Sequence, residues 1–142
     1  MTQTLEFKQR GQLDPALSDP ATRTLNADKL TGRWLNTSPE TEGVAEIVIE
    51  QDGGRFFVSV MGAGESGPIA WPRTEATPLA NLEEEAGQRA LALGVDFEFG
   101  FMRAETYLRV NKGVLVIVAY YTFLDGSPRS SYVNREFFYR HG

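Results

Sequence analysis

The order of apolar and polar residues along this chain indicates β-strands. In residues 44–51, Ala45, Ile47 and Ile49 alternate with Glu46 and Glu50. This is the pattern of a strand with one face on a core and the other in water. Similar runs recur at even spacing along the chain. We predict eight strands, over residues 33–37, 44–51, 55–61, 69–79, 90–101, 103–110, 114–124 and 130–140.

Short glycine-containing segments separate these runs. Residues 52–54 read Asp-Gly-Gly and predict a tight hairpin, because glycine adopts a positive φ without steric cost. Residues 111–113 and 125–128 are similar turns. In the fourth run, Pro72 and Pro78 restrict pairing to an edge or a bulge. The spacing predicts an all-β fold, an eight-stranded antiparallel up-and-down barrel or, as the alternative, a sandwich.

The segment before the first strand has no sustained periodicity. We predict that residues 1–30 form an N-terminal tail and that residues 31–142 form the barrel domain. The tail should end in a short helical turn over residues 27–30, with Asn26 as its N-cap. The polar, acidic segment 81–89 is expected to be either a loop or one helical turn.

The seventh predicted strand, residues 114–124, is apolar on both faces. Val114, Val116 and Val118 point one way, and Leu115 and Ile117 point the other. A single-layer barrel has one wet face, so two dry faces indicate that something covers the outside. We expect the cover to be either the N-terminal tail or a second subunit. If a second subunit covers this face, the protein is a homodimer.

The first strand opens with Gly32 and Trp34, and the last strand carries two basic residues, Arg135 and Arg140. A Gly-x-Trp opening paired with a basic residue on the last strand resembles the lipocalin-like (calycin) barrels. The resemblance implies that Trp34 closes one end of the barrel. It also implies that an arginine of the last strand packs across the indole in a cation–π contact.

Residues 32–140 also resemble a small bacterial family of unassigned function. The features that carry this resemblance are the Gly-x-Trp-x-Asn start, Trp71 after the third strand, and a Tyr/Thr-rich seventh strand before an Asp-Gly-Ser turn. They cover about three quarters of the chain. They imply the fold and say little about chemistry.

Composition and charge exclude several classes of function. The net charge of −5 lacks the basic footprint of a nucleic-acid-binding protein. The longest apolar run, residues 114–121, is too short to span a membrane, and residues 1–10 show no signal peptide. There is no cysteine, which excludes disulfides and thiolate chemistry and agrees with a cytoplasmic location.

Two sequence motifs suggest chemistry that their surroundings do not support. Residues 62–67 match Gly-x-Gly-x-x-Gly, but Pro68 and Pro72 prevent the helix that a dinucleotide site requires. We interpret the segment as a mobile hairpin loop at one barrel mouth. His141 is the only histidine and lies one residue from the end, a poor position for a catalytic base or a metal ligand. No metal or cofactor is expected.

The aromatic residues carry the functional hypotheses. An eight-stranded barrel either fills its interior with side chains or holds one small ligand there, and the sequence leaves both open. The first hypothesis is an intracellular barrel that binds one small, largely apolar ligand in its interior. The candidate ligand-binding residues are Trp34, Asn36, Phe57, Trp71, Arg73, Phe97, Phe99, Tyr107, Tyr121 and Tyr132.

Two alternatives remain beside that hypothesis. One is a cofactor-independent cyclase or isomerase that uses the barrel cavity as its active site, with catalytic residues unassigned. The other is a filled barrel with a structural or interaction role. The arginine at position 73 favours an acidic or carbonyl-bearing ligand, and in an enzyme a tyrosine beside Arg73 is the expected acid.

Overall fold

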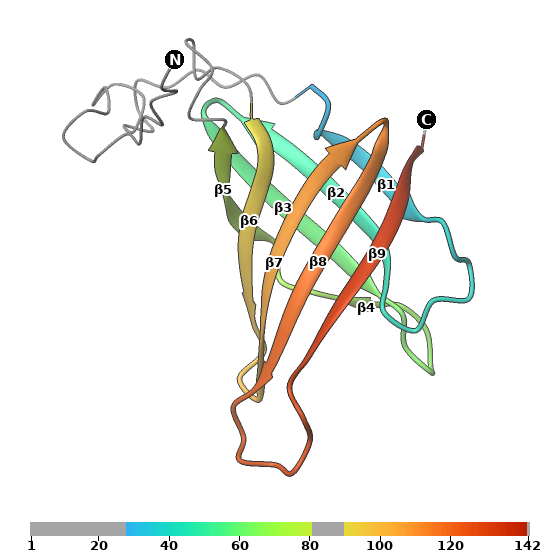
Figure 1. The fold of residues 1–142 in the computed structure, drawn as a ribbon, viewed down its shortest axis with the longest axis vertical. Helices are drawn as coiled ribbons and strands as arrows, with labels where there is room; N and C mark the ends of the chain where they lie inside the picture. The colour runs from blue at the N-terminus through green and yellow to red at the C-terminus, as the bar shows by residue number, and fades with distance from the viewer. Residues whose placement is uncertain (1–27, 81–89, 142) are drawn as a thin grey trace, which may run out of the picture.

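The computed structural model describes residues 28–80 and 90–141, which form an antiparallel β-barrel (Figure 1). No helix occurs within these two ranges. The strands are β1 (Gly32–Asn36), β2 (Val44–Asp52), β3 (Arg55–Gly62), β4 (Ile69–Ala70), β5 (Thr74–Ala80), β6 (Ala90–Glu98), β7 (Met102–Asn111), β8 (Val114–Phe123) and β9 (Tyr132–His141).

The strands close into a ring. The sheet order is β2-β1-β9-β8-β7-β6-β5-β3-β4, and a further pairing of β2 with β3 joins the two ends. The ring therefore contains β1, β2, β3 and β5 to β9, and every pairing in it is antiparallel. Strand β4 pairs with the end of β3 and lies outside the ring. The predicted eight-stranded up-and-down barrel is confirmed.

The fourth predicted strand is wrong as one continuous element. The structure divides residues 69–79 into β4 and β5, and residues 71–73 between them are not strand. Pro72 lies in this gap, where its missing N–H removes no ladder hydrogen bond. Pro78 lies beyond the part of β5 that pairs with β3, and a register shift with β6 follows at Leu79. The expected position beside a bulge is confirmed for Pro78, whereas Pro72 interrupts the strand instead.

The predicted strand 90–101 is too long at its end. Strand β6 ends at Glu98, and the chain turns over residues 99–101 into β7. Gly100 has a φ of 82°, and the amide of Phe99 donates to the carbonyl of Met102 over 2.9 Å. The turn leaves Phe101 exposed. The alternation also fails at Ala45, because a register shift between Val44 and Glu46 turns Val44 into the core instead.

Inward-facing side chains pack into one hydrophobic cluster inside the ring. The buried positions alternate along the strands, as in β8, where Leu115 and Ile117 are buried between partly exposed valines. The largest fully buried side chains come from β1, β2, β3, β6, β7, β8, β9 and the turn before β1. They are Trp34, Phe56, Phe97, Phe138, Leu30, Ile47, Ile49, Leu93, Leu108, Leu115, Ile117 and Val44.

Some predictions concern segments outside the described residues. These are the tail up to residue 27, Asn26 as a helix cap, and the acidic segment 81–89. Of the predicted helical turn, residues 28–30 are described, and they form a hydrogen-bonded turn that leads into β1. The predicted facing of β8 is confirmed, since Leu115 and Ile117 are buried whereas Val114, Val116 and Val118 are partly exposed.

Candidate functional site

Trp34 closes the end of the barrel where the described chain begins. Its side chain is 1% exposed, and its indole Nε1 donates to the carbonyl of Leu30 over 2.9 Å. The Arg140 Cζ lies 4.7 Å from the centroid of the Trp34 ring. The same guanidinium donates to the carbonyls of Asp28, Lys29 and Thr31, so it ties the entering turn to the last strand. The expected tryptophan–arginine closure is confirmed, with Arg140 as the partner.

Trp71 lies at the opposite end, on the link between β4 and β5. Its ring meets Phe97 and Phe99 edge-on at centroid distances of 5.1 Å each, and Tyr121 at 6.4 Å. Its backbone amide donates to the carbonyl of Val60 over 2.9 Å, which anchors the link to β3. Three aromatic residues, two on ring strands and one on a turn, therefore contact an indole that does not belong to any strand of the barrel.

The Gly-x-Gly-x-x-Gly segment makes room for this indole. A Cβ on Gly62 would lie 2.8 Å from Trp71 Nε1, closer than real Cβ atoms approach other heavy atoms. Residues 63–68 then form a tight loop, in which the amide of Gly67 donates to the carbonyl of Gly64 over 3.1 Å. The expected hairpin loop at a barrel mouth is confirmed, and the first glycine serves tryptophan packing.

Tyr121 and Tyr132 extend the aromatic cluster across the mouth. They are directly paired in the β8–β9 register, and their rings stack at 4.6 Å with an interplanar angle of 22°. Tyr121 is buried, whereas Tyr132 is half-exposed. Burial, and then the nearby Tyr132 and Glu136, raises the pKa of the Tyr121 hydroxyl well above its ordinary value. This hydroxyl therefore stays protonated at neutral pH.

Glu136 is the functional candidate that sequence reasoning missed. Its carboxylate accepts hydrogen bonds from Asn36 Nδ2 over 3.1 Å, from the amide of Val44 over 2.9 Å, and from the hydroxyl of Thr41. A Cβ on Gly43 would lie 2.7 Å from one of its oxygens. Glu136 thus attaches the β1–β2 loop to β9. The available signal was its position two residues before the buried Phe138, on the inward face of the last strand.

A hollow lies between the β1–β2 loop and the β3–β4 loop, at the same end of the barrel as Trp71, which is the lower end in Figure 1. It has a volume of about 410 Å³ and is lined by Thr41, Glu42, Ala63, Gly64 and Glu65. The amide of Ala63 donates to the carbonyl of Gly43 over 2.7 Å and joins the two loops beneath it. This hollow begins one residue from Gly62, which packs against Trp71, and its two carboxylates give it an acidic rim.

Three of the predicted site residues lie on the outer surface instead. The Arg73 guanidinium is exposed, lies 4.0 Å from the centroid of the Phe57 ring, and is 3.6 Å from Glu50. Phe57 is also approached by Arg55. Tyr107 is exposed and contacts Gly94 on the outside of β6. The assumed facing of these side chains was wrong, so Arg73 no longer argues for an acidic ligand inside the barrel.

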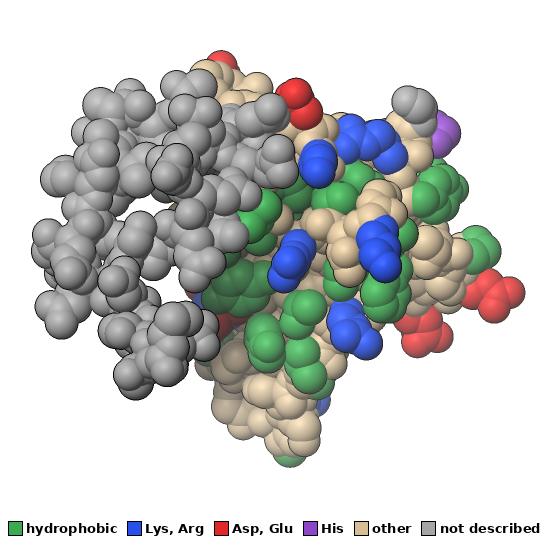
Figure 2. Space-filling view, turned by 45° about the horizontal axis from the view of Figure 1, so that its top comes forward, with side chains coloured by type: hydrophobic (Ala, Val, Ile, Leu, Met, Phe, Trp, Pro, Cys, Tyr) green, Lys and Arg blue, Asp and Glu red, His purple; other side chains and the backbone are tan. Residues whose placement is uncertain are grey.

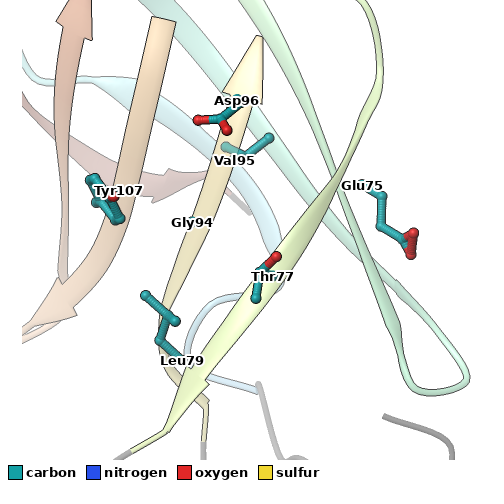
Figure 3. Close-up of a pocket in the computed structure, with 7 residues that line it drawn as sticks. All are labelled: Glu75, Thr77, Leu79, Gly94, Val95, Asp96 and Tyr107. Carbon is teal, nitrogen blue, oxygen red and sulfur yellow. The ribbon is translucent and has the colours of Figure 1, made fainter.

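The outer surface around Tyr107 forms a second hollow, of about 370 Å³ (Figure 3). Figure 3 shows Tyr107 and Thr77 on either side of Gly94, Leu79 below it, and Glu75 pointing away from them. Glu75 is held by two hydrogen bonds from Arg55, at 2.8 and 3.0 Å, which lower the pKa of its carboxyl. The hollow therefore combines the apolar residues Leu79 and Val95 with two carboxylates, those of Glu75 and Asp96.

The structure thus brings together Trp71, Phe97, Phe99, Tyr121 and Tyr132 at one end. Asn36 instead donates to Glu136. Trp34 lies at the other end. Comparison of the chain with protein-family models, curated proteins and solved structures found no match. The described ranges contain no helix long and apolar enough to cross a membrane. The class that the fold defines is an eight-stranded antiparallel β-barrel, compatible with a lipocalin-like fold.

Proposed function

We propose that this protein binds one small, largely apolar molecule at the lower end of the barrel, against Trp71, Phe99 and Tyr132. The observation that carries the proposal is the position of Trp71. Its indole lies across the ring opening, yet it belongs to a link outside the ring and is held by edge-on aromatic contacts. Each such contact contributes about 0.5–1.5 kcal/mol beyond area burial, and an apolar ligand would add contacts of the same kind.

The chemistry of the surrounding groups supports a neutral or basic ligand. Glu42 and Glu65 border the hollow between the β1–β2 and β3–β4 loops at the same end of the barrel, and its volume of about 410 Å³ lies in the range of small-molecule sites. No arginine lines this hollow, whose lining residues all belong to the described ranges. A planar, apolar molecule would stack on Tyr132 and Phe99, and a ligand carboxylate would meet the acidic rim.

Membership of the calycin group, and of the Gly-x-Trp-x-Asn bacterial family, is part of the proposal. Its support is the Trp34–Arg140 contact, which joins the first and last strands as the resemblance implies. A cytoplasmic location is proposed on the sequence alone, because a chain without cysteine suits a reducing compartment.

A binding experiment with matched variants tests the proposal. The probe is N-phenyl-1-naphthylamine, a neutral aromatic dye whose emission rises in apolar surroundings. We expect saturable binding that weakens roughly tenfold in Phe99→Ala and in Tyr132→Ala, as loss of about 1.4 kcal/mol of contact implies. The controls are Phe57→Ala and Tyr139→Ala. Tyr139 is 48% exposed and Tyr132 is 50% exposed on the same strand, but Tyr139 faces outward.

Two results would overturn the binding proposal. One is the absence of saturable binding by the wild-type protein. The other is equal weakening by the outer-face controls, which would place the dye elsewhere on the surface.

The alternative function is a cofactor-independent cyclase or isomerase at the same end. It is favoured by the neighbouring Tyr121 hydroxyl and Glu136 carboxylate, one kept protonated by burial and the other held by three donors. A protonated phenol can donate a hydrogen bond to a developing oxyanion. Turnover of a bound compound that is lost in Tyr121→Phe, with binding retained, would support the enzyme over the binder.

A further inference from the structure

The outer face of β7, β8 and β9 carries several large apolar side chains, whereas the solvent-facing side of a sheet is usually polar. Tyr107, Tyr120, Val133 and Phe137 are 47%, 49%, 58% and 42% exposed, and the outward valines of β8 lie among them. Figure 2 shows hydrophobic side chains interleaved with lysine and arginine side chains over this part of the surface. Contiguous apolar surface of this kind marks an interaction site.

The strand registers arrange this face in three rows across the sheet. In the first row, Val116 lies between Arg109 on β7 and Phe137 on β9. The second row has Val118 between Tyr107 and Arg135, and the third has Tyr120 between Glu105 and Val133. Side chains of the first two rows border a hollow of about 480 Å³. The cations therefore lie in the first two rows and the carboxylate lies in the third.

The charges of this face are incompletely neutralised within the subunit. Arg109 and Arg135 form no ion pair with any residue in the described ranges, whereas Glu105 pairs with Arg103 at 3.1 Å. Asp96 lies directly opposite Glu105 in the β6–β7 register. Like charges opposite each other on adjacent strands are destabilising, so this acidic pair has room for a further cation.

We propose that a second copy of this chain docks here, about a two-fold axis that crosses the strands at Val118. Such an axis brings the first row of one subunit opposite the third row of the other. Val116 then meets Tyr120 of the partner subunit, and Phe137 meets Val133 of the partner subunit. Arg109 meets Glu105 of the partner subunit, beside the partner's Asp96. The first and third rows are therefore complementary to each other in both charge and apolar contact.

Barrel geometry limits how far this contact extends. Two sheets that pack face to face keep their strands nearly aligned and lie about 10 Å apart. Because the outside of a barrel is convex, only the central strand β8 and its two neighbours approach closely. Arg135 lies on the axis row and meets Arg135 of the partner subunit, which opposes association.

The test is a charge-swap experiment on the full-length protein, read by sedimentation equilibrium. The wild type should dimerise reversibly. Arg109→Glu and Glu105→Arg should each raise the dimer dissociation constant at least about tenfold, and the double variant should restore it to within about threefold of wild type. Arg135→Gln should lower the constant, because it removes a like-charge approach. Arg73→Glu is the control, since Arg73 is also exposed but lies on the link between β4 and β5.

Circular dichroism of each variant should match that of the wild type, as expected for substitutions at positions that are at least partly exposed. A wild-type protein that remains monomeric at about 200 μM, well above the micromolar range of specific weak association, would overturn the proposal. Residues 1–27 would produce this monomeric result if they covered the face. Failure of the double variant to recover, or an Arg73→Glu effect equal to that of Arg109→Glu, would also overturn it.

Discussion

The two ends of this barrel are each closed by a tryptophan, in different ways. At the upper end, Trp34 belongs to a ring strand, is 1% exposed, and is held by a hydrogen bond and by Arg140. At the lower end, Trp71 lies on a link outside the ring, is partly exposed, and has no indole hydrogen bond within the described residues. The first closure is part of a ring strand, whereas the second is added by a link outside the ring.

The difference follows from where each aromatic sits in the chain. Trp34 pairs through its backbone with β2 and β9, so moving its side chain disturbs the barrel seam. Trp71 is joined to β3 by one backbone hydrogen bond to Val60. A closure held by a few contacts opens at lower free-energy cost than one built into the core. The binding proposed for the lower end would therefore use the more weakly held of the two closures.

Truncating the two tryptophans should separate the ends most strongly. We expect Trp34→Ala to lower the free energy of unfolding by about 3–5 kcal/mol, as for other fully buried aromatic residues. Trp71→Ala should cost roughly 1–3 kcal/mol, because it loses mainly edge-on contacts and partial burial. Urea denaturation measures both. Equal losses would contradict the distinction between the ends.

Glu136 provides the strongest polar attachment at the lower end. Glu136→Ala leaves the Val44 amide and the Thr41 hydroxyl without their acceptor, and Asn36 Nδ2 keeps only the Val44 carbonyl. We expect the free energy of unfolding to fall by about 2 kcal/mol, from loss of charged acceptors to these donors. The control is Glu50→Ala, an exposed carboxylate on β2 whose loss should cost less than about 0.5 kcal/mol. A loss no greater than that of the control would show that the carboxylate does not hold the loop.

Gly62 tests how closely the loop fits Trp71. Gly62→Ala places a Cβ 2.8 Å from the indole nitrogen and should move the ring, at a cost of about 1 kcal/mol. The tryptophan emission maximum should shift with it. Gly94→Ala is the control, because its Cβ would meet Tyr107 at an ordinary 3.5 Å. An unchanged emission spectrum in Gly62→Ala would mean that the indole is not packed on this glycine.

The smallest expected effect is a pH dependence from Tyr121. Its folded-state pKa is raised, first by burial and then by Tyr132 and Glu136. The folded state therefore favours the protonated phenol, and this stabilisation is complete below the unfolded-state pKa of about 10. It is lost as pH rises above that value. Tyr121→Phe should flatten the alkaline fall in melting temperature, and an identical fall in both proteins would exclude the effect.

The fold was largely predictable because its signals are local. Alternation in residues 44–51 and glycine turns such as 52–54 predicted the strands, and the Gly32–Trp34 opening implied the closed upper end. The break between β4 and β5 was missed because Pro72 was interpreted as a residue of an edge strand. A proline can also end a strand, and Pro72 does so here.

The site was only partly predictable because facing depends on register. A shift of one residue moves a side chain from the inside to the outside, and this error displaced Tyr107 and Phe57 in the sequence prediction. Glu136 was missed because its donors lie 92–100 residues earlier in the chain, too far for any local pattern to reveal.

The most direct test of a fixed upper end and an openable lower end is acrylamide quenching of two single-tryptophan variants. Trp34→Phe reports Trp71 alone, and Trp71→Phe reports Trp34 alone. The quenching constant of Trp71 should exceed that of Trp34 several-fold, since only Trp71 is partly exposed. Saturating N-phenyl-1-naphthylamine should protect Trp71 and leave Trp34 unchanged. Equal quenching of the two residues, or no protection of Trp71 by the dye, would contradict the account.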